Sequence, residues 1–388
     1  MRVRVIHIIT KLELGGAQEN TIFTVKNLSR KIFNPALWSG PGGILTEEVS
    51  KNLGENFKLV PHLVRELNPK NDLLALWELF WLLRQEKKKY SPIIVHTHSS
   101  KAGILGRWAS FLAGIPIIIH SYHGFGFNDY QPFYLRWLFI NLERATARIT
   151  DSFIFVSRAN MAKALQLGIG KDKGYHLIRS GIEIERFKPK AIDIQKKRKE
   201  LGIENGKVVT MVSCLKPQKN PLDFARSAKI VLEHFPDVWF VHCGDGELRP
   251  DLEKLIKDLG IQDRVKLLGW RRDIPEIMWA SDLIVLTSLW EGLPRVYPQA
   301  MASERAIIGT NVDGAKEAVI NGVNGYLVAP KDYQSLAQKI IELLKDDKKR
   351  IAFGKKGAEL VEEFDIWKMV QKQEELYQRL LQEKGLWN

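Results

Sequence analysis

Short apolar runs rich in β-branched residues alternate along the chain with longer amphipathic stretches, and this alternation limits the possible folds more than any other feature. The runs are apolar at nearly every position, which is typical of strands buried on both faces. Such strands form parallel sheets covered by helices, so the sequence predicts a doubly wound α/β fold. Strands are expected at residues 3–9, 92–98, 116–123, 152–157, 176–181, 207–213, 238–244, 264–269, 282–288, 305–310 and 325–330. Helices are expected at 17–30, 72–89, 101–113, 134–148, 222–234, 248–260 and 333–347.

A charged segment in the middle of the chain, residues 185–206, contains a proline and two glycines but no strand-like run. The chain has 388 residues, which is too long for a single hydrophobic core. We therefore expect two Rossmann-like domains, residues 1–185 and 186–364, with the charged segment as the hinge. The last segment, 365–388, is expected to be a helix that packs back onto the first domain.

The composition is that of a globular protein, with 45% hydrophobic and 27% charged residues. Cys214 and Cys243 cannot form a disulfide framework and belong to no zinc-binding pattern. Residues 1–10 run directly into a strand pattern without a signal peptide. These features predict a cytoplasmic protein. The net charge of +13 favours an anionic partner but does not choose between nucleic acid, acidic lipid and a phosphorylated substrate.

Residues that directly follow the strands are the candidate binding residues, because ligands of open α/β sheets bind beyond the carboxyl ends of the strands. Gly15 and Gly16 precede a helix whose free N–H groups could bind an anion, although an ordinary strand-to-helix turn explains them equally well. His123 ends a strand, where it has either a structural or a site role. Gly244 and Gly246 form a Gly-Asp-Gly turn, which suits a nucleotide and is also common in ordinary turns.

Two lysines, Lys216 and Lys219, flank a proline turn after the strand at 207–213. Lysines in this place could neutralise a diphosphate without a metal ion. The chain has no Walker sequence, so ATP hydrolysis of the P-loop type is not expected. No acidic pair follows a strand and no carboxylate pair resembles a glycosidase dyad, so we expect neither a divalent metal nor another cofactor.

Several segments, each weak alone, together resemble the retaining glycosyltransferases of the family 4 type in their order and spacing. The resemblance covers nearly the whole chain. It implies the GT-B fold, in which two Rossmann-like domains face each other across a cleft. The segments are LGGAQ at 14–18 and the stretches 95–110, 123–125, 214–224, 243–248, 268–302 and 312–328.

The resemblance implies roles for residues in the stretch LWEGLPRVYPQAM, 289–301. Glu291 would approach the hydroxyl groups of the donor sugar, and the backbone N–H groups of Gly292 and Leu293 would face sugar and phosphate. The family has a second glutamate eight positions after the first, and it binds the ribose hydroxyls. This chain has Gln299 there, which can accept a hydrogen bond but lacks the charge and the second acceptor oxygen.

Two further positions depart from the family pattern. Cys214 stands where arginine is common, and Arg-Ser-Gly stands at 179–181 where Pro-Asn-Gly is common. The diphosphate would therefore rely on Lys219, with help from Lys216.

The resemblance also implies the reaction. A hexose or N-acetylhexosamine would pass from a nucleoside diphosphate, UDP by default, to a glycan or lipid-linked acceptor in the synthesis of cell-surface polysaccharide or glycolipid. The anomeric configuration would be retained, and the leaving phosphate would help to deprotonate the acceptor. His123 would contact the donor sugar or polarise the site. Arg271 lies in the loop 269–274, whose backbone would bind the donor's base, so GDP-linked donors remain open.

An apolar stretch at residues 73–83 has ten apolar residues of eleven, two of them tryptophans. It is too short to span a bilayer. It is either buried against the sheet or inserted into an interface beside anionic lipid. Residues 132–148 repeat this composition, and together they favour a peripheral enzyme on the cytoplasmic face of the membrane.

Three alternatives differ in class from this prediction. A degenerate protein of the same fold would act as a scaffold, given the departures at Gln299 and Cys214. A nucleotide-sugar epimerase would need acidic and basic groups for carbon deprotonation, and the sequence has no such set. A nucleic-acid-binding protein would place aromatic residues inside basic patches. Here the aromatic residues lie in apolar runs, so no nucleic acid is expected as a partner.

Overall fold

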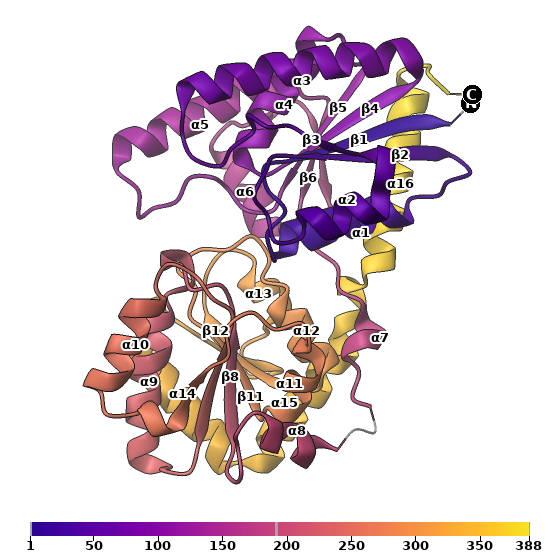
Figure 1. Ribbon diagram of the computed structural model, residues 1–388. Coiled ribbons are helices and arrows are strands. Elements are labelled where there is room, and N and C mark those ends of the chain that lie inside the picture. The colour runs from indigo at the N-terminus through magenta and orange to yellow at the C-terminus, as the bar shows by residue number, and fades with distance from the viewer. Residues whose placement is uncertain (1, 191–192, 388) are drawn as a thin grey trace. The chain divides into compact units, whose positions relative to one another are not determined.

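The computed structural model describes residues 2–190 and 193–387 (Figure 1), and they divide into two compact units. The chain passes from the first unit to the second between Gly181 and Ile182 and returns between Asp365 and Ile366. Each unit has a parallel sheet with helices on both faces, which confirms the α/β fold expected from the alternating sequence pattern.

The first unit contains a seven-stranded sheet in the order β3-β2-β1-β4-β5-β6-β7. All neighbouring strands pair in parallel. The strand order reverses between β1 and β4, which is the place where doubly wound sheets bind ligands. The strands are β1 Val3–Ile9, β2 Phe33–Ser39, β3 Phe57–Leu59, β4 Ile93–His98, β5 Ile117–Tyr122, β6 Ser152–Phe155 and β7 Gly174–Leu177.

Helices cover this sheet on both faces (Figure 1). The side chains of β1 alternate: Ile6 and Ile8 pack with α3 and α4 on one face, whereas Val3 and Val5 pack with α16 on the other. This alternation is expected, because successive strand residues point to opposite sides. The helices are α1 Gly16–Asn27, α2 Thr46–Leu53, α3 Pro69–Lys89, α4 Ser100–Leu112, α5 Phe133–Ala147, α6 Arg158–Gln166 and α16 Ile366–Glu383.

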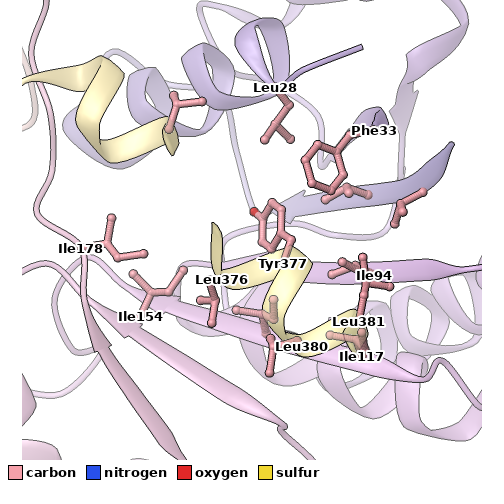
Figure 2. Packing of buried hydrophobic residues seen from close by; sticks show 14 of the residues in the cluster. Leu28, Phe33, Ile94, Ile117, Ile154, Ile178, Leu376, Tyr377, Leu380 and Leu381 are labelled. Atoms are coloured by element: carbon pink, nitrogen blue, oxygen red, sulfur yellow. The ribbon is translucent and has the colours of Figure 1, made fainter. Parts of the chain in front are cut away.

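The C-terminal helix α16 belongs to the first unit although it follows the second in sequence. Figure 2 shows Tyr377 and its neighbours on α16 packed against Phe33 of β2 and Ile94 of β4. The Tyr377 side chain is fully buried. Residues more than 280 positions apart therefore share one hydrophobic core in this unit.

The second unit contains a six-stranded parallel sheet in the order β10-β9-β8-β11-β12-β13, which reverses between β8 and β11. Its strands are β8 Val208–Val212, β9 Trp239–Cys243, β10 Val265–Leu267, β11 Leu283–Leu286, β12 Ala306–Thr310 and β13 Gly325–Val328. Its helices are α7 Ile184–Phe187, α8 Ile194–Glu200, α9 Pro221–His234, α10 Arg249–Asp258, α11 Ile274–Ala280, α12 Val296–Ala302, α13 Ala315–Ala318, α14 Tyr333–Lys345 and α15 Asp347–Leu360.

The segment 185–206, expected from the sequence to be the hinge, contains the helices α7 and α8 and packs on the second unit. Arg198 of α8 donates a hydrogen bond to the carbonyl of Ala280 (2.9 Å) and forms an ion pair with Asp282 (2.9 Å). The Trp279 indole donates to the carbonyl of Phe187 at the end of α7 (2.8 Å). Residues 191–192 lie outside the described residues.

No helix among the described residues is both long and apolar enough to cross a membrane.

Candidate active site

In the second unit, the loops that follow β8 and β11 meet where the strand order reverses. The Thr287 hydroxyl donates to the carbonyls of Lys219 (2.8 Å) and Asn220 (2.9 Å). The amide of Leu289 donates to the carbonyl of Gln218 (2.8 Å), and the Gln218 side chain donates back to the carbonyl of Trp290 (2.9 Å). The two loops are therefore held together by hydrogen bonds from one backbone amide and two side chains to backbone carbonyls, which fixes the side chains that the loops carry.

Glu291 is the central residue of this site, and its side chain is only 8% exposed. Its carboxylate oxygen Oε1 accepts hydrogen bonds from the Lys219 ammonium group and from the Ser288 hydroxyl (2.6 Å). Its backbone amide donates to a carboxylate oxygen of Asp313, which follows β12 (2.8 Å). Because both side-chain bonds end on Oε1, the described residues leave Oε2 to accept from the hydroxyl group of a ligand.

The ion pair between Lys219 and Glu291 is largely shielded from water, since the Lys219 side chain is 18% exposed. Burial of two charges costs several kcal/mol per ion, and their attraction only about offsets this cost. Such a pair at the switch point of a sheet therefore points to a functional site more than to a contribution to stability.

The glycine turn after β9 packs directly on the loop after β8. Gly244 has a φ of +130°, and a Cβ atom there would lie 1.9 Å from the carbonyl oxygen of Ser213. A Cβ atom on Gly246 would lie 2.6 Å from the carbonyl oxygen of Leu215. The close approach of protein backbone thus explains both glycines before any nucleotide is considered.

Arg271 lies beyond β10, and the antiparallel bridge between Gly244 and Gly269 joins this loop to the turn after β9. The Arg271 guanidinium binds both carboxylate oxygens of Asp273, at 2.8 and 2.6 Å. Partial burial acts in the opposite direction, but hydrogen bonds from Arg271 and Lys197 hold the pKa of Asp273 well below its usual range. Asp273 is therefore ionised and fixes the position of Arg271 at neutral pH.

The short helix α12 carries Gln299, which is half-buried, and Tyr297, which is fully buried. Burial raises the pKa of Tyr297, and the negative charge of Glu291 adds to this effect, so the phenol stays neutral. A Cβ atom on Gly309 of β12 would lie 2.1 Å from the Tyr297 hydroxyl oxygen. Glycine at this position of β12 therefore makes room for the phenol.

In the first unit, His123 follows β5 and is half-buried. Its Nε2 lies 3.1 Å from Nδ1 of His98, at the end of β4. Gly16 is the first residue of α1, and Gly15 precedes it with extended backbone (φ −172°). Helix α1 also carries Asn20, which lines a cavity of about 10 Å³ together with His98 and His123. Asn20 is buried, and neither polar atom of its amide has a hydrogen-bond partner among the described residues.

The structure thus brings the predicted site residues together in two groups, one within each unit. Gly15, Gly16 and His123 belong to the first unit; the others lie in loops or first helical turns after strands of the second unit, namely Lys216, Lys219, Gly244, Gly246, Arg271, Glu291, Gly292, Leu293 and Gln299. His98, Ser288, Tyr297 and Asp313 are site residues that were not predicted from the sequence. The sequence could have indicated all four, because each lies at or just after the end of a buried strand or in the stretch 289–301.

Two Rossmann-like units, each with polar residues at its switch point, define a two-domain protein of the GT-B type. A family model described as "Glycosyl transferases group 1" matches residues 193–360, and one described as "Glycosyltransferase Family 4" matches residues 15–186. A relative in Escherichia coli is 34% identical over 97% of both chains. The chain belongs to this glycosyltransferase family, which confirms the resemblance and the enzyme class expected from the sequence.

Two relatives and one solved structure are similar to this chain over most of its length. The Escherichia coli relative is the UDP-Gal:alpha-D-GlcNAc-diphosphoundecaprenol alpha-1,3-galactosyltransferase. The N,N'-diacetylbacillosaminyl-diphospho-undecaprenol alpha-1,3-N-acetylgalactosaminyltransferase of Campylobacter jejuni is 26% identical, over 78% of this chain and 81% of its own. The crystal structure of Anabaena Alr3699/HepE in complex with UDP-glucose has a TM-score of 0.80 and 25% identity, and the match covers 97% of this chain and 99% of that one.

Proposed function

We propose that this glycosyltransferase moves a hexose or N-acetylhexosamine from a UDP-sugar to a lipid-linked sugar, with retention of the anomeric configuration, in the synthesis of a cell-surface polysaccharide or glycolipid. The observation that carries the proposal is the shielded ion pair of Lys219 and Glu291 at the switch point of the second unit. The names of the Escherichia coli and Campylobacter jejuni relatives support a lipid-diphosphate-linked acceptor.

The charges of the site match those of the reaction. Departure of the donor's diphosphate leaves negative charge on the phosphate and positive character on the sugar. Lys219 is the cation nearest to Glu291, and it stabilises the leaving diphosphate when donor binds. Glu291 accepts a hydrogen bond from a sugar hydroxyl through Oε2. Lys216 and the backbone amides of Gly292 and Leu293 contribute further positive charge or N–H groups, so the diphosphate needs no divalent metal.

Glu291 holds the donor sugar and does not attack it. One oxygen of its carboxylate is already bonded to an ammonium group and to a hydroxyl group, which leaves Oε2 to hold a hydroxyl of the sugar. The leaving phosphate is then the base that takes the proton of the acceptor hydroxyl. Attack of the acceptor on the face that the diphosphate leaves gives retention.

A lipid-linked acceptor lies in a membrane, and the first unit carries a surface suited to reach it. Helix α3 buries one stripe, Ala75, Leu79 and Leu83, and exposes another of leucines and tryptophans. The exposed large apolar residues are Leu73, Leu74, Trp77 and Trp81 on α3 and Phe133, Tyr134, Trp137 and Leu138 on α5. Residues 73–83 are thus buried along one stripe of the helix and exposed along another, and the exposed stripe is the part that could insert into a lipid interface.

Basic residues accompany this aromatic surface. Lys70, Arg84 and Lys87 to Lys89 are exposed on α3, and Arg136 lies on α5. Aromatic side chains beside lysines and arginines suit the boundary between headgroups and acyl chains of an anionic bilayer. We therefore place the enzyme at the cytoplasmic face of the membrane as a peripheral protein, with this surface against the lipid.

The experiment that tests the proposed reaction combines donors and acceptors. UDP-Gal, UDP-Glc, UDP-GalNAc and UDP-GlcNAc are each incubated with a diphosphoundecaprenol-linked N-acetylhexosamine, with and without EDTA. We expect one donor to react, equally with EDTA, and NMR of the product to show the anomeric configuration of the donor. An inverted product or a requirement for metal would contradict the mechanism.

Two further results would favour other functions. Conversion of a UDP-sugar to its epimer without acceptor would indicate an epimerase. If UDP, GDP, ADP and CDP all failed to raise the melting temperature, the protein would be a scaffold without a working nucleotide site.

A further inference from the structure

Four histidines of the first unit lie on one face of its sheet at the carboxyl ends of three adjacent strands. His7 of β1 pairs in register with His96 of β4, and His98 follows two positions later, on the same face. His123 comes two residues after Ser121 of β5, the register partner of His98. The alternation of side chains and the strand order β1-β4-β5 thus bring these imidazoles together.

Three of the rings form a continuous hydrogen-bonded chain. Nδ1 of His7 lies 2.9 Å from Nε2 of His98, and Nδ1 of His98 lies 3.1 Å from Nε2 of His123. The rings of His7 and His98 are stacked, with an interplanar angle of 10°. The chain begins in the core, where His7 is fully buried, and ends at half-buried His123.

His96 is close to these rings but has partners of its own. Its Nδ1 lies 2.6 Å from the Tyr377 hydroxyl, and its Nε2 lies 2.8 Å from the Ser121 hydroxyl. Nitrogen atoms of His7, His96 and His98 all lie within 4.8 Å of one another. Since hydrogen bonds occupy both nitrogens of His96 and both of His98, the group is a hydrogen-bonded network and not an open set of metal ligands.

The hydrogen-bonded chain has only two proton arrangements. A neutral imidazole has one N–H donor and one acceptor nitrogen, so the tautomer of each ring dictates that of the next. Either all three rings carry the proton on Nδ1, or all three carry it on Nε2. Burial lowers the pKa of His7 to about 3, and burial with neighbouring histidines holds that of His98 well below its usual range. Both rings therefore remain neutral near pH 7.

A cavity of about 10 Å³ borders His123, so the side chains around this ring leave a small gap beside it. We infer that His98 is a positioning residue, which holds His123 in one orientation and one tautomer through the hydrogen bond between Nδ1 of His98 and Nε2 of His123. This bond thereby determines whether Nδ1 of His123 is a donor or an acceptor. The inference rests on the proposed function only in that His123 contacts the donor sugar.

Two substitutions of His98 test its two hydrogen bonds separately, the one with His7 and the one with His123. The polar atoms of asparagine occupy the place of Nδ1, so His98→Asn keeps a partner for His123 and loses the one for His7. Glutamine places its polar atoms at Nε2, so His98→Gln keeps the partner of His7 and loses that of His123. We expect His98→Gln to lower kcat about 10- to 100-fold, as loss of an orienting partner of a functional histidine does, and His98→Asn to retain most of kcat.

The direct measurement is the tautomer of His123, read from long-range ¹H–¹⁵N spectra of protein labelled at its nine histidines. The His123 signals are assigned by their loss in His123→Gln. In the wild type and in His98→Asn we expect one protonated and one unprotonated nitrogen. In His98→Gln we expect averaged shifts from a mixture of tautomers.

A single tautomer that persists in His98→Gln would overturn the inference. The inference would also be overturned if kcat fell equally in the two variants and in step with the decrease in their melting temperatures. This result would show a purely structural role of His98. The spectra need no turnover and therefore separate the two hypotheses. If the wild type transferred no sugar, the proposed function would fail, and the tautomer of His123 in the two variants would still decide whether His98 positions it.

Discussion

Lys219 and Glu291, which are 72 residues apart in the chain, form an ion pair in which the ammonium group shares Oε1 of the carboxylate with the Ser288 hydroxyl. The two residues follow β8 and β11, which are neighbours only because the strand order reverses there. Every other pair of neighbouring strands in this sheet is consecutive in strand number, so only β8 and β11 bring together loops from distant parts of the sequence. The switch point is therefore what allows one cation and one carboxylate to act on the same ligand.

Replacing Glu291 with glutamine removes the charge of the ion pair and keeps the size of the side chain. We expect kcat/KM to fall about 100-fold or more, because a preorganised polar contact to the reacting sugar is lost and the Lys219 charge is left unpaired. Steady-state kinetics with the preferred UDP-sugar measure the loss. Glu204→Gln, at an exposed glutamate in the loop before β8, is the matched control. Activity of Glu291→Gln within threefold of the control would contradict a direct role.

Gln299→Glu tests the contact with the ribose. A carboxylate has a second acceptor oxygen, and its hydrogen bonds are about twice as strong as those of a neutral amide. We expect UDP to bind about fivefold more tightly, which corresponds to roughly 1 kcal/mol. Titration calorimetry with UDP gives this Kd, and Gln299→Ala should move it in the opposite direction. Equal Kd values for all three proteins would show that the side chain does not touch the nucleotide.

The sequence predicted most of the strands, because strands that are buried on both faces appear in a sequence as continuous apolar runs. It did not predict β2 and β3. Strand β2 contains Asn34 and Pro35, which weaken the strand pattern, and β3 has only three residues, among them the exposed Leu59. These strands form through pairing with β1 and with each other, which is a tertiary effect that a single run of residues does not contain.

The site was predictable in its residues but not in its contacts. The position of Lys219 and Glu291 after buried strands marked both as candidates, whereas their pairing depends on the strand order. The alternation of His96 and His98 is visible in the sequence. The contact of His98 with His123 requires the register of β4 against β5. Register depends on packing of both sheet faces and cannot be read from either strand alone.

The buried histidines of the first unit make its stability depend on pH. Unfolded histidine gains a proton below about pH 6.5, whereas burial lowers the pKa of each of these side chains in the folded state. The unfolded state then binds more protons, so stability falls as pH decreases from 6.5, by up to about 2 kcal/mol per histidine at pH 5. The buried histidines with lowered pKa are His7, His96, His98 and His120 in the first unit and His242 in the second.

Hydrogen exchange read by mass spectrometry compares the two units in one sample at pH 6.5 and pH 5.0, a range above the usual pKa values of carboxyl groups. After correction for intrinsic exchange rates, peptides of β1, β4 and β5 should lose far more protection than those of β8 and β9. His7→Gln removes one titrating group and should reduce the loss in the first unit. Exposed His234 is the control for this variant, as His234→Gln. The same loss of protection in both units would contradict the expected role of the buried histidines.

The surface of α3 and α5 predicts binding to anionic membranes. Trp77 is 59% and Trp81 50% exposed, and they contact each other edge to face. Replacing both with serine should lower binding to vesicles of phosphatidylglycerol and phosphatidylcholine at least tenfold, because two aromatic anchors are lost from the interface. Trp270→Ser, at a similarly exposed tryptophan of the second unit, should leave binding unchanged. Co-sedimentation at low and at physiological salt measures both effects, and binding should weaken with salt because lysines and arginines contribute.

If the double variant bound like the wild type, the aromatic surface would not be the membrane contact. Turnover of a short-chain, water-soluble acceptor should stay the same in the double variant, because the substitutions leave the ion pair of Lys219 and Glu291 in the second unit untouched.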